Sequence, residues 1–118
     1  MASVYRHGLL AERRVALKYQ QSGFVILDRN WRCRVGELDV VALSGSTLAV
    51  IEVKWRRSYS YGGARAAVGP VKQARIKAAT TAWLTAHPEW LGRDDVSVRF
   101  DVAALTGGSI EIIERAFE

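Results

Sequence analysis

The sequence has few of the residues that build covalent or metal cross-links. Its 118 residues include one cysteine, Cys33, two histidines and two prolines. A single cysteine excludes an internal disulfide framework and is typical of a reducing compartment. Together with His7 and His87 it is also too little for a structural zinc site, which needs four ligands. One hydrophobic core must therefore hold the fold, and the chain is long enough for one domain, residues 1–118.

Long apolar runs are missing as well. No segment approaches the length of a membrane span, and the N-terminus lacks the charged region, hydrophobic stretch and cleavage site of a secretory signal. There is no glycine-rich phosphate loop of the Walker type, no internal repeat and no low-complexity tract. We therefore expect a cytoplasmic protein with no membrane association.

Positive charge is in excess. The chain has 17 lysines and arginines against 12 aspartates and glutamates, a net charge of +5, and a pI near 9.8. This balance is compatible with an anionic partner such as nucleic acid, although many basic proteins bind none.

One segment combines strongly apolar runs with ionisable residues. It is Gly36 to Lys54, GELDVVALSGSTLAVIEVK, in which Ser44-Gly45-Ser46 separates two runs rich in Val, Ile and Leu. This pattern predicts a β-hairpin with a two-residue loop at Gly45-Ser46, where glycine comes first as in a type II′ turn. The resulting register places Asp39 opposite Glu52 and Glu37 opposite Lys54, all on one face of the hairpin.

Two carboxylates held opposite each other favour a bound cation. Residues opposed across strands have Cβ atoms about 5 Å apart, and like charges there are destabilising. Carboxylate oxygens suit hard ions such as Mg²⁺ or Mn²⁺. Lys54, on the same face as Glu52, would then orient or help deprotonate an attacking water, or stabilise negative charge in the transition state.

Two simpler interpretations remain open. Glu37 and Lys54 would form an ordinary cross-strand ion pair, and Asp39 and Glu52 would lie on a solvated face. However, both faces of the hairpin are apolar, because Val41 opposes Val50 on the acidic face while residues such as Leu38, Val40, Ile51 and Val53 fill the other. This is the pattern of a covered central sheet, and it favours the metal site.

The same residues resemble a known nuclease core. Asp39 followed across a hairpin by Glu52-x-Lys54 is similar to the PD-(D/E)xK motif of the restriction-endonuclease-like fold. Over nearly the whole chain, GELD, IEVKWR, RFDV and a closing AF resemble the YraN-like family of small bacterial proteins. The resemblance implies a metal-dependent endonuclease fold, of the kind that archaeal Holliday-junction resolvases also use, with Asp39, Glu52 and Lys54 as catalytic residues.

The resemblance also implies further metal ligands. In related nucleases a glutamate from the first helix completes the site, which makes Glu12 a candidate ligand, and the Val53 carbonyl is another. A surface glutamate paired with neighbouring arginines is an equally good interpretation of Glu12. Glu37 is expected to tune Lys54 rather than to bind the ion. Asp101 of the RFD motif is explained as well by a structural pairing with an arginine as by catalysis.

Basic and aromatic residues near these motifs are candidates for substrate binding. After Lys54 the segment WRRSYSYGGARAAVG mixes arginines that suit phosphates with rings that suit stacking on bases. Asn30 and Arg32 also lie near the start of the GELD strand. The alternatives are a loop whose rings pack down, an edge strand protected by its arginines, and a solvated helix face. The substrate-binding candidates are Arg34, Arg56, Arg57, Tyr59, Tyr61, Arg65, Lys72 and Gln73.

The remaining pattern predicts the element order α-β-β-β-α-β-β, an α/β restriction-endonuclease-like sandwich with a mixed central sheet flanked by helices. The first helix is expected over Ser3–Gln21 with Leu9, Leu10, Ala16 and Leu17 facing inward. The second should begin at Gly69-Pro70 and pack through a stripe of Ala74, Ala78, Ala82 and Trp83.

The leading functional hypothesis is a Mg²⁺- or Mn²⁺-dependent nuclease acting on nucleic acid, with DNA favoured and branched or flapped structures as candidate substrates. A two-fold homodimer would suit a symmetric junction. The alternatives are a module of the same fold that binds nucleic acid without cleaving it, and a structural or protein-interaction role.

Overall fold

Seven elements follow one another in the predicted order. The computed structural model describes residues 2–56, 68–90 and 93–118, with backbone alone for residues 2–9. This α/β arrangement confirms the predicted fold class. The elements are α1 (Ala2–Gln21), β1 (Val25–Cys33), β2 (Gly36–Ser44), β3 (Thr47–Arg56), α2 (Pro70–Ala86), β4 (Ser97–Thr106) and β5 (Ser109–Phe117).

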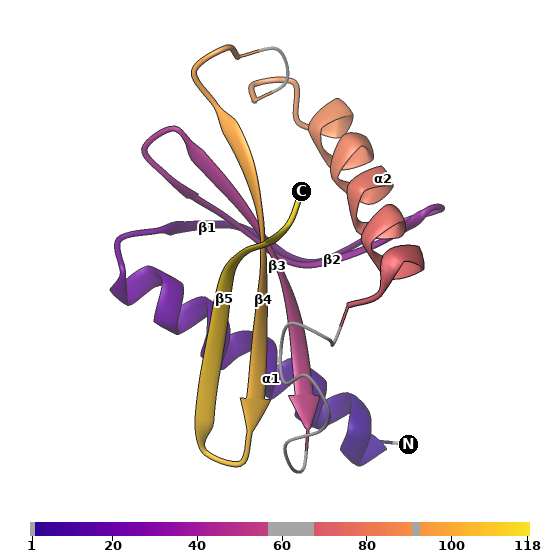
Figure 1. Cartoon of the computed structure of the whole chain (residues 1–118), viewed down its shortest axis with the longest axis vertical. Coiled ribbons are helices and arrows are strands. Elements are labelled where there is room, and N and C mark those ends of the chain that lie inside the picture. The colour runs from indigo at the N-terminus through magenta and orange to yellow at the C-terminus, as the bar shows by residue number, and fades with distance from the viewer. Residues whose placement is uncertain (1, 57–67, 91–92) are drawn as a thin grey trace.

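The strands form one mixed sheet in the order β1-β2-β3-β4-β5. Neighbouring strands are antiparallel except β3 and β4, which run parallel. Parallel neighbours need a crossover connection, and α2 lies between β3 and β4 in the chain. Figure 1 shows the β1–β2 hairpin crossing β3 at a steep angle, so the sheet is strongly twisted.

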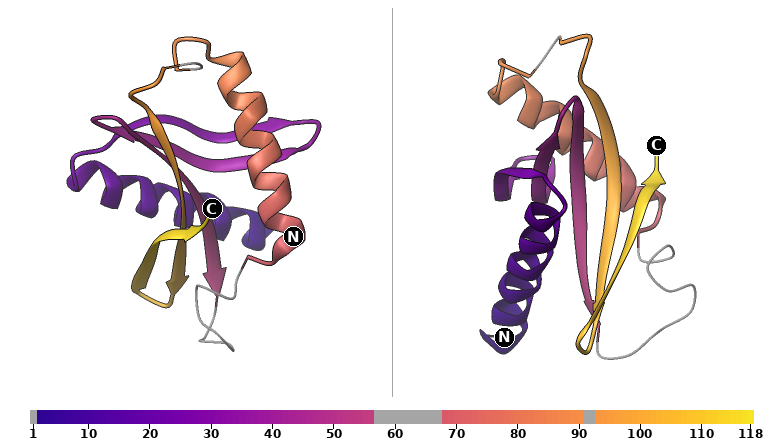
Figure 2. Two further views of the ribbon diagram at one scale, coloured as in Figure 1. Left: turned by 45° about the horizontal axis from the view of Figure 1, so that its top comes forward. Right: turned by 90° about the vertical axis from the view of Figure 1, so that its left-hand side faces the viewer.

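The two helices cover opposite faces of the sheet, because alternate residues of the central strands belong to two separate cores. On one face, α2 contributes Ile76, Ala79 and Trp83, which pack with Val41 and Val50. On the other face, α1 contributes Ala11, Val15 and Tyr19, which pack with strand residues including Val40, Ala42, Ala49 and Ile51. Figure 2 shows the sheet between these two layers.

The buried faces of the helices differ from those predicted. Ala16 is buried, but Leu10 and Leu17 are half exposed, and the side chain of Leu9 lies outside the described part of the chain. On α2, Trp83 is buried while Ala74 and Ala78 are exposed and Ala82 is partly buried. The larger Ile76, together with Ala79 and Thr80, replaces the predicted alanine stripe. Neither described helix is long and apolar enough to cross a membrane.

The predicted hairpin register holds near the turn and stops short of the acidic residues. Residues 40–44 of β2 pair with residues 51–47 of β3 in the expected register, and Gly45 has the positive φ of 58° that the turn requires. The last pair of this ladder is Val40 with Ile51. Asp39 and Glu52 are therefore not a ladder pair, and Leu38 packs in the core under α2 rather than beside Val40.

Candidate active site

The candidate site lies where β2 separates from β3. Beyond Val40 the two strands no longer exchange backbone hydrogen bonds. Instead, the backbone N–H of Val53 donates to Asp39 Oδ2 over 2.8 Å. The Asp39 carboxylate thus takes the place of a strand carbonyl, which fixes its position at the opening between the strands.

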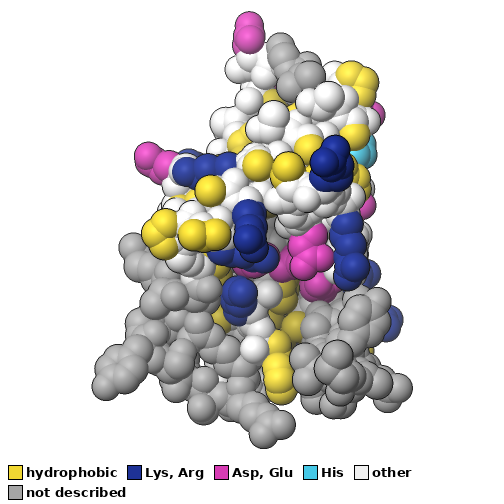
Figure 3. Space-filling view, turned by 90° about the vertical axis from the view of Figure 1, so that its right-hand side faces the viewer, with side chains coloured by type: hydrophobic (Ala, Val, Ile, Leu, Met, Phe, Trp, Pro, Cys, Tyr) yellow, Lys and Arg dark blue, Asp and Glu magenta, His cyan; other side chains and the backbone are white. Residues whose placement is uncertain are grey.

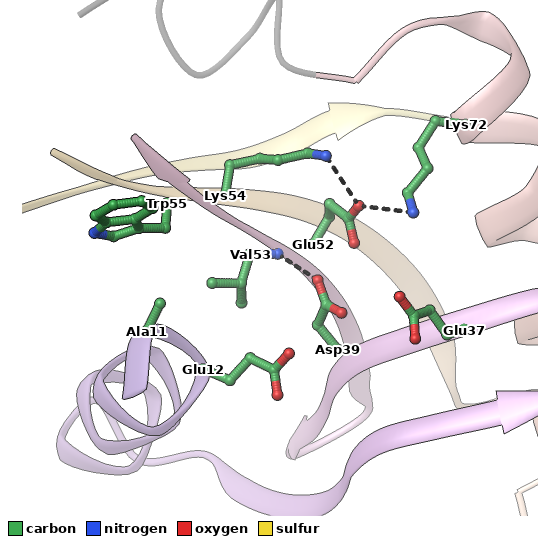
Figure 4. Close-up of a pocket in the computed structure, with 9 residues that line it drawn as sticks. All are labelled: Ala11, Glu12, Glu37, Asp39, Glu52, Val53, Lys54, Trp55 and Lys72. Atoms are coloured by element: carbon green, nitrogen blue, oxygen red, sulfur yellow. Dashed lines mark hydrogen bonds and ion pairs between the residues drawn. The ribbon is translucent and has the colours of Figure 1, made fainter. Parts of the chain in front are cut away.

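This opening is a pocket of about 220 Å³ that collects residues from four elements. Figure 4 shows carboxylates of α1, β2 and β3 directed into one space, with Glu12 extending from α1 toward the strands and the Asp39 carboxylate turned toward the Val53 nitrogen. The pocket therefore unites the predicted catalytic and metal-binding residues. Its lining is Ala11, Glu12, Glu37, Asp39, Glu52, Val53, Lys54, Trp55 and Lys72.

Two lysines hold the buried Glu52. Glu52 is 5% exposed, and its Oε2 lies 3.3 Å from Lys72 Nζ and 3.8 Å from Lys54 Nζ. Figure 4 shows its carboxylate turned toward both ammonium groups. Two cations therefore compensate this buried charge, while each lysine keeps about a third of its side chain exposed and can meet an anionic substrate.

Glu12 and Asp39 have weaker compensation, because neither forms an ion pair within the described part of the chain and the charges of Arg29 and Lys72 offset only part of the cost. Burial raises the pKa of Glu12 to about 7, and the charge of Asp39 adds to the increase. Burial also raises the pKa of Asp39 well above its ordinary range, with Glu52 raising it further. Glu12 Oε1 is buried and has no hydrogen-bond partner. A buried carboxylate that is only partly compensated is costly, so these two residues form a site that favours a proton or a cation.

The oxygen donors in this pocket are of the type that hard divalent cations bind, but they are too far apart to coordinate one ion together. Among the described residues, no three His, Cys, Asp or Glu side chains stand close enough together to hold a metal ion. Glu52 contacts Lys54 and Lys72 on one side and interacts with Asp39 on the other. Asp39 and Glu52 already interact with each other, so a rearrangement around this pair would be needed for a third carboxylate to join them.

The face that carries the pocket has acidic side chains at its centre and basic side chains on either side. Figure 3 shows this pattern over the hollow between the strands and α2. The acids are those of the pocket, and Lys54 and Lys72 line the same hollow. Arg32 lies at the rim, where its Nε is 3.3 Å from Glu37 Oε2. A phosphate that approached the acids would therefore meet positive charge first.

Several predicted residues have other partners. Glu37 pairs with Arg32, whereas Lys54 pairs with Glu52, so the interpretation of Glu37 and Lys54 as an ordinary cross-strand ion pair is wrong. The Gln73 side chain donates to the Val68 carbonyl at the start of α2 and does not line the pocket.

The remaining substrate-binding candidates lie at or beyond the edges of the described structure. Arg34 is exposed in the turn after β1. Arg56 is the last residue of β3, and its side chain is not described. Arg57, Tyr59, Tyr61 and Arg65 lie outside the described residues.

Sequence reasoning gave no structural role to Asn30. It belongs to β1 yet has a φ of 53°, and its side chain lies close enough to Glu12 to offset part of the rise in the pKa of that carboxyl. Asparagine is one of the few residues that tolerate this left-handed conformation. An asparagine inside an otherwise extended segment was the available signal.

Removing the Glu12 charge should stabilise the metal-free protein at alkaline pH. The pKa of Glu12 is about 7 in the folded state and ordinary in the unfolded chain, so the unfolded state releases this proton first and stability falls as pH rises through 7. At pH 8.5 in EDTA, Glu12→Gln should unfold with a free energy at least about 1 kcal/mol above that of the parent. Urea denaturation measures this difference.

The advantage of Glu12→Gln should shrink toward pH 5, where both proteins are neutral at this position, and also on addition of Mn²⁺ to the parent. An advantage of equal size at pH 5 and pH 8.5 would contradict this origin.

Comparison with known proteins identifies a family whose model covers the pocket. The model of the uncharacterised protein family UPF0102 matches residues 11–105, a span that contains the whole pocket lining. A UPF0102 protein of Kineococcus radiotolerans is 50% identical over 99 residues, 84% of this chain and 79% of its own. One from Geobacter sulfurreducens is 44% identical over 116 residues, 94% and 88% respectively. One from Syntrophus aciditrophicus is 40% identical over 122 residues, 100% and 93%.

Proposed function

The chain belongs to the uncharacterised protein family UPF0102, and we propose that it is a metal-dependent nuclease that hydrolyses phosphodiester bonds in nucleic acid, with DNA as the favoured substrate. The observation that carries the proposal is the joint placement of Glu12, Asp39, Glu52 and Lys54 in one pocket. They come from a helix and two strands that separate there. A pocket that only bound phosphates would have no physical need for buried carboxylates whose charge is only partly compensated.

Each residue of the pocket has a role in this proposal. Asp39, Glu52 and Glu12 would hold Mg²⁺ or Mn²⁺ together with the Val53 carbonyl. The ion would polarise a phosphoryl oxygen and lower the pKa of an attacking water. The Val53 N–H keeps Asp39 oriented, so that one ligand is in place before substrate arrives.

The lysines link substrate binding to the acids. Lys72 and Lys54 both contact Glu52, and an incoming phosphate offers them a stronger partner than a carboxylate that also has an ion to bind. Glu52, which already interacts with Asp39, would then be free to bind the ion together with it. Lys54 remains beside the reacting phosphate, where it orients the water or stabilises the developing negative charge.

The direct test is a cleavage assay. Labelled single-stranded, duplex, flapped and four-way-junction DNA, and RNA, are incubated with the protein in Mg²⁺, in Mn²⁺ or in EDTA. We expect cleavage of at least one DNA substrate that requires the metal and stops in EDTA. Cleavage of none of them, or cleavage that persists in EDTA, would contradict the proposal.

A module that binds nucleic acid without cleaving it is the second candidate, since lysines and arginines surround the pocket. Binding in EDTA is expected for both candidates, and it should weaken steeply as salt rises because phosphate contacts release counterions. Binding without cleavage in any metal would favour the second candidate. No DNA or RNA affinity even at low salt would exclude both and favour a protein-interaction role.

A further inference from the structure

Two non-glycine residues of the described structure have a positive φ, Asn30 and Arg115. A β-carbon makes this backbone conformation unfavourable, so each case needs a compensating interaction. Arg115 has one, because its backbone N–H donates to the buried carboxylate of Asp101 over 3.0 Å, beside a register shift between β4 and β5. The conformation of Arg115 is therefore explained by the sheet itself.

Asn30 has no comparable explanation within the sheet. The register shift between β1 and β2 lies earlier, between Ile26 and Asp28. The pairs on either side of Asn30 are Arg29 with Val40 and Trp31 with Leu38, which places Asn30 opposite Asp39 with no extra residue to accommodate. Backbone strain at a place where the register does not change often marks a functional position.

The hairpin changes face at this point. Val40 belongs to the core under α1, whereas Leu38 and its partner Trp31 pack in the core under α2. Two residues apart in a regular strand would share a face, so both strands rotate together between the pair that precedes Asn30 and the pair that follows it. This is also where β2 leaves β3 and Asp39 accepts its hydrogen bond from Val53.

The side chain of Asn30 connects this rotation to α1. It lies close enough to Glu12 to favour the ionised carboxylate, as the charge of Arg29 also does, whereas burial and the charge of Asp39 oppose ionisation. The second Glu12 oxygen, Oε1, is buried without a partner. One carboxylate oxygen is thus free for another ligand while the group as a whole is held in place.

We propose that Asn30 is a positioning residue of the metal site, held in a left-handed conformation opposite Asp39 so that its side chain directs the Glu12 carboxylate toward Asp39. The inference rests on the proposed function and extends it to a residue that does not touch the ion or the substrate. Partners that orient metal ligands typically change metal affinity by about 10- to 100-fold when removed.

The test is the variant Asn30→Gly. Glycine adopts a positive φ without cost, so the fold is preserved and the melting temperature in EDTA should equal or exceed that of the parent. The affinity for Mn²⁺ alone, measured by calorimetric titration, should fall by about 10-fold or more. Arg115→Gly is the matched control, since it relieves the same backbone conformation in a residue outside the pocket and should leave Mn²⁺ affinity unchanged.

A second measurement shows whether Asn30 acts through Glu12. In a Glu12→Gln background, Asn30→Gly should have little further effect on Mn²⁺ affinity, because the effects of substitutions at interacting residues do not add. The inference would be overturned if Asn30→Gly bound Mn²⁺ as tightly as the parent does. It would also be overturned if Asn30→Gly lowered Mn²⁺ affinity in the Glu12→Gln background as much as it does in the parent. Either result would leave the proposed function intact. A parent protein that bound no Mn²⁺ would overturn both.

Discussion

Asp39→Ala should abolish metal-dependent cleavage, with a loss of about 10³-fold or more in rate, since a bound ion supplies several kcal/mol of transition-state stabilisation. The variant removes both a proposed ligand and the acceptor for the Val53 N–H. Asp39→Asn separates these two effects. It keeps an oxygen that accepts the hydrogen bond but removes the charge, and we expect the same loss of cleavage from it. Rates measured under single-turnover conditions give both values.

Glu37→Gln is the matched control for Asp39. Glu37 comes from the same strand and lines the same pocket, but its side chain is 42% exposed and pairs with Arg32 at the rim. It is not a proposed ligand, so we expect an effect below about 10-fold, from altered charge near the substrate. Equal losses in Glu37→Gln and Asp39→Asn would mean that the pocket needs general negative charge rather than a specific ligand. Normal cleavage by Asp39→Asn would contradict the metal-site assignment.

The sequence predicted that the acidic residues and Lys54 would lie together because they belong to one hairpin. Alternating apolar residues and a Gly45-Ser46 turn predicted the register from Val40 to Ser44, and Asp39, Glu52 and Lys54, just beyond it, line one pocket. Side-chain alternation depends only on strand geometry. The order of the elements followed from similarly local signals.

The features that were missed depend on tertiary structure. Alternation alone assumes that a hairpin stays paired and flat, whereas this hairpin rotates at Asn30 and Asp39 replaces a backbone acceptor, so the ladder ends three pairs before the predicted pair of Glu37 with Lys54. Lys72 was expected only as a contact for substrate, but the packing of α2 on the sheet places it against Glu52. The prediction of which helix residues are buried failed for the same reason, since nothing local to Leu10 or Leu17 shows which side of α1 the sheet covers.

Asp101→Asn should cause the largest loss of stability. Asp101 is fully buried, and its carboxylate accepts hydrogen bonds from the Tyr19 hydroxyl over 2.7 Å, from Arg99 Nε over 3.0 Å and from the Arg115 backbone N–H over 3.0 Å. It confirms the structural pairing with an arginine that the sequence suggested. Asparagine is similar in size, but it removes the charge that Arg99, whose side chain is 12% exposed, needs as a partner. Breaking a buried ion pair costs about 3–5 kcal/mol, which urea denaturation at neutral pH measures.

The chain contains a matched control for this loss. Arg93 and Asp95 repeat the residue types and spacing of Arg99 and Asp101, with contacts of 2.7 and 3.1 Å, but this pair is exposed to solvent. Asp95→Asn should therefore leave stability essentially unchanged, because surface ion pairs contribute little. Equal effects of the two substitutions would show that burial is not what makes Asp101 important. Tyr19, which donates to Asp101, and Glu12 are both buried on α1. Loss of the contact between Tyr19 and Asp101 should therefore also reduce Mn²⁺ affinity. Such a loss would connect the stability of the fold to the geometry of the pocket.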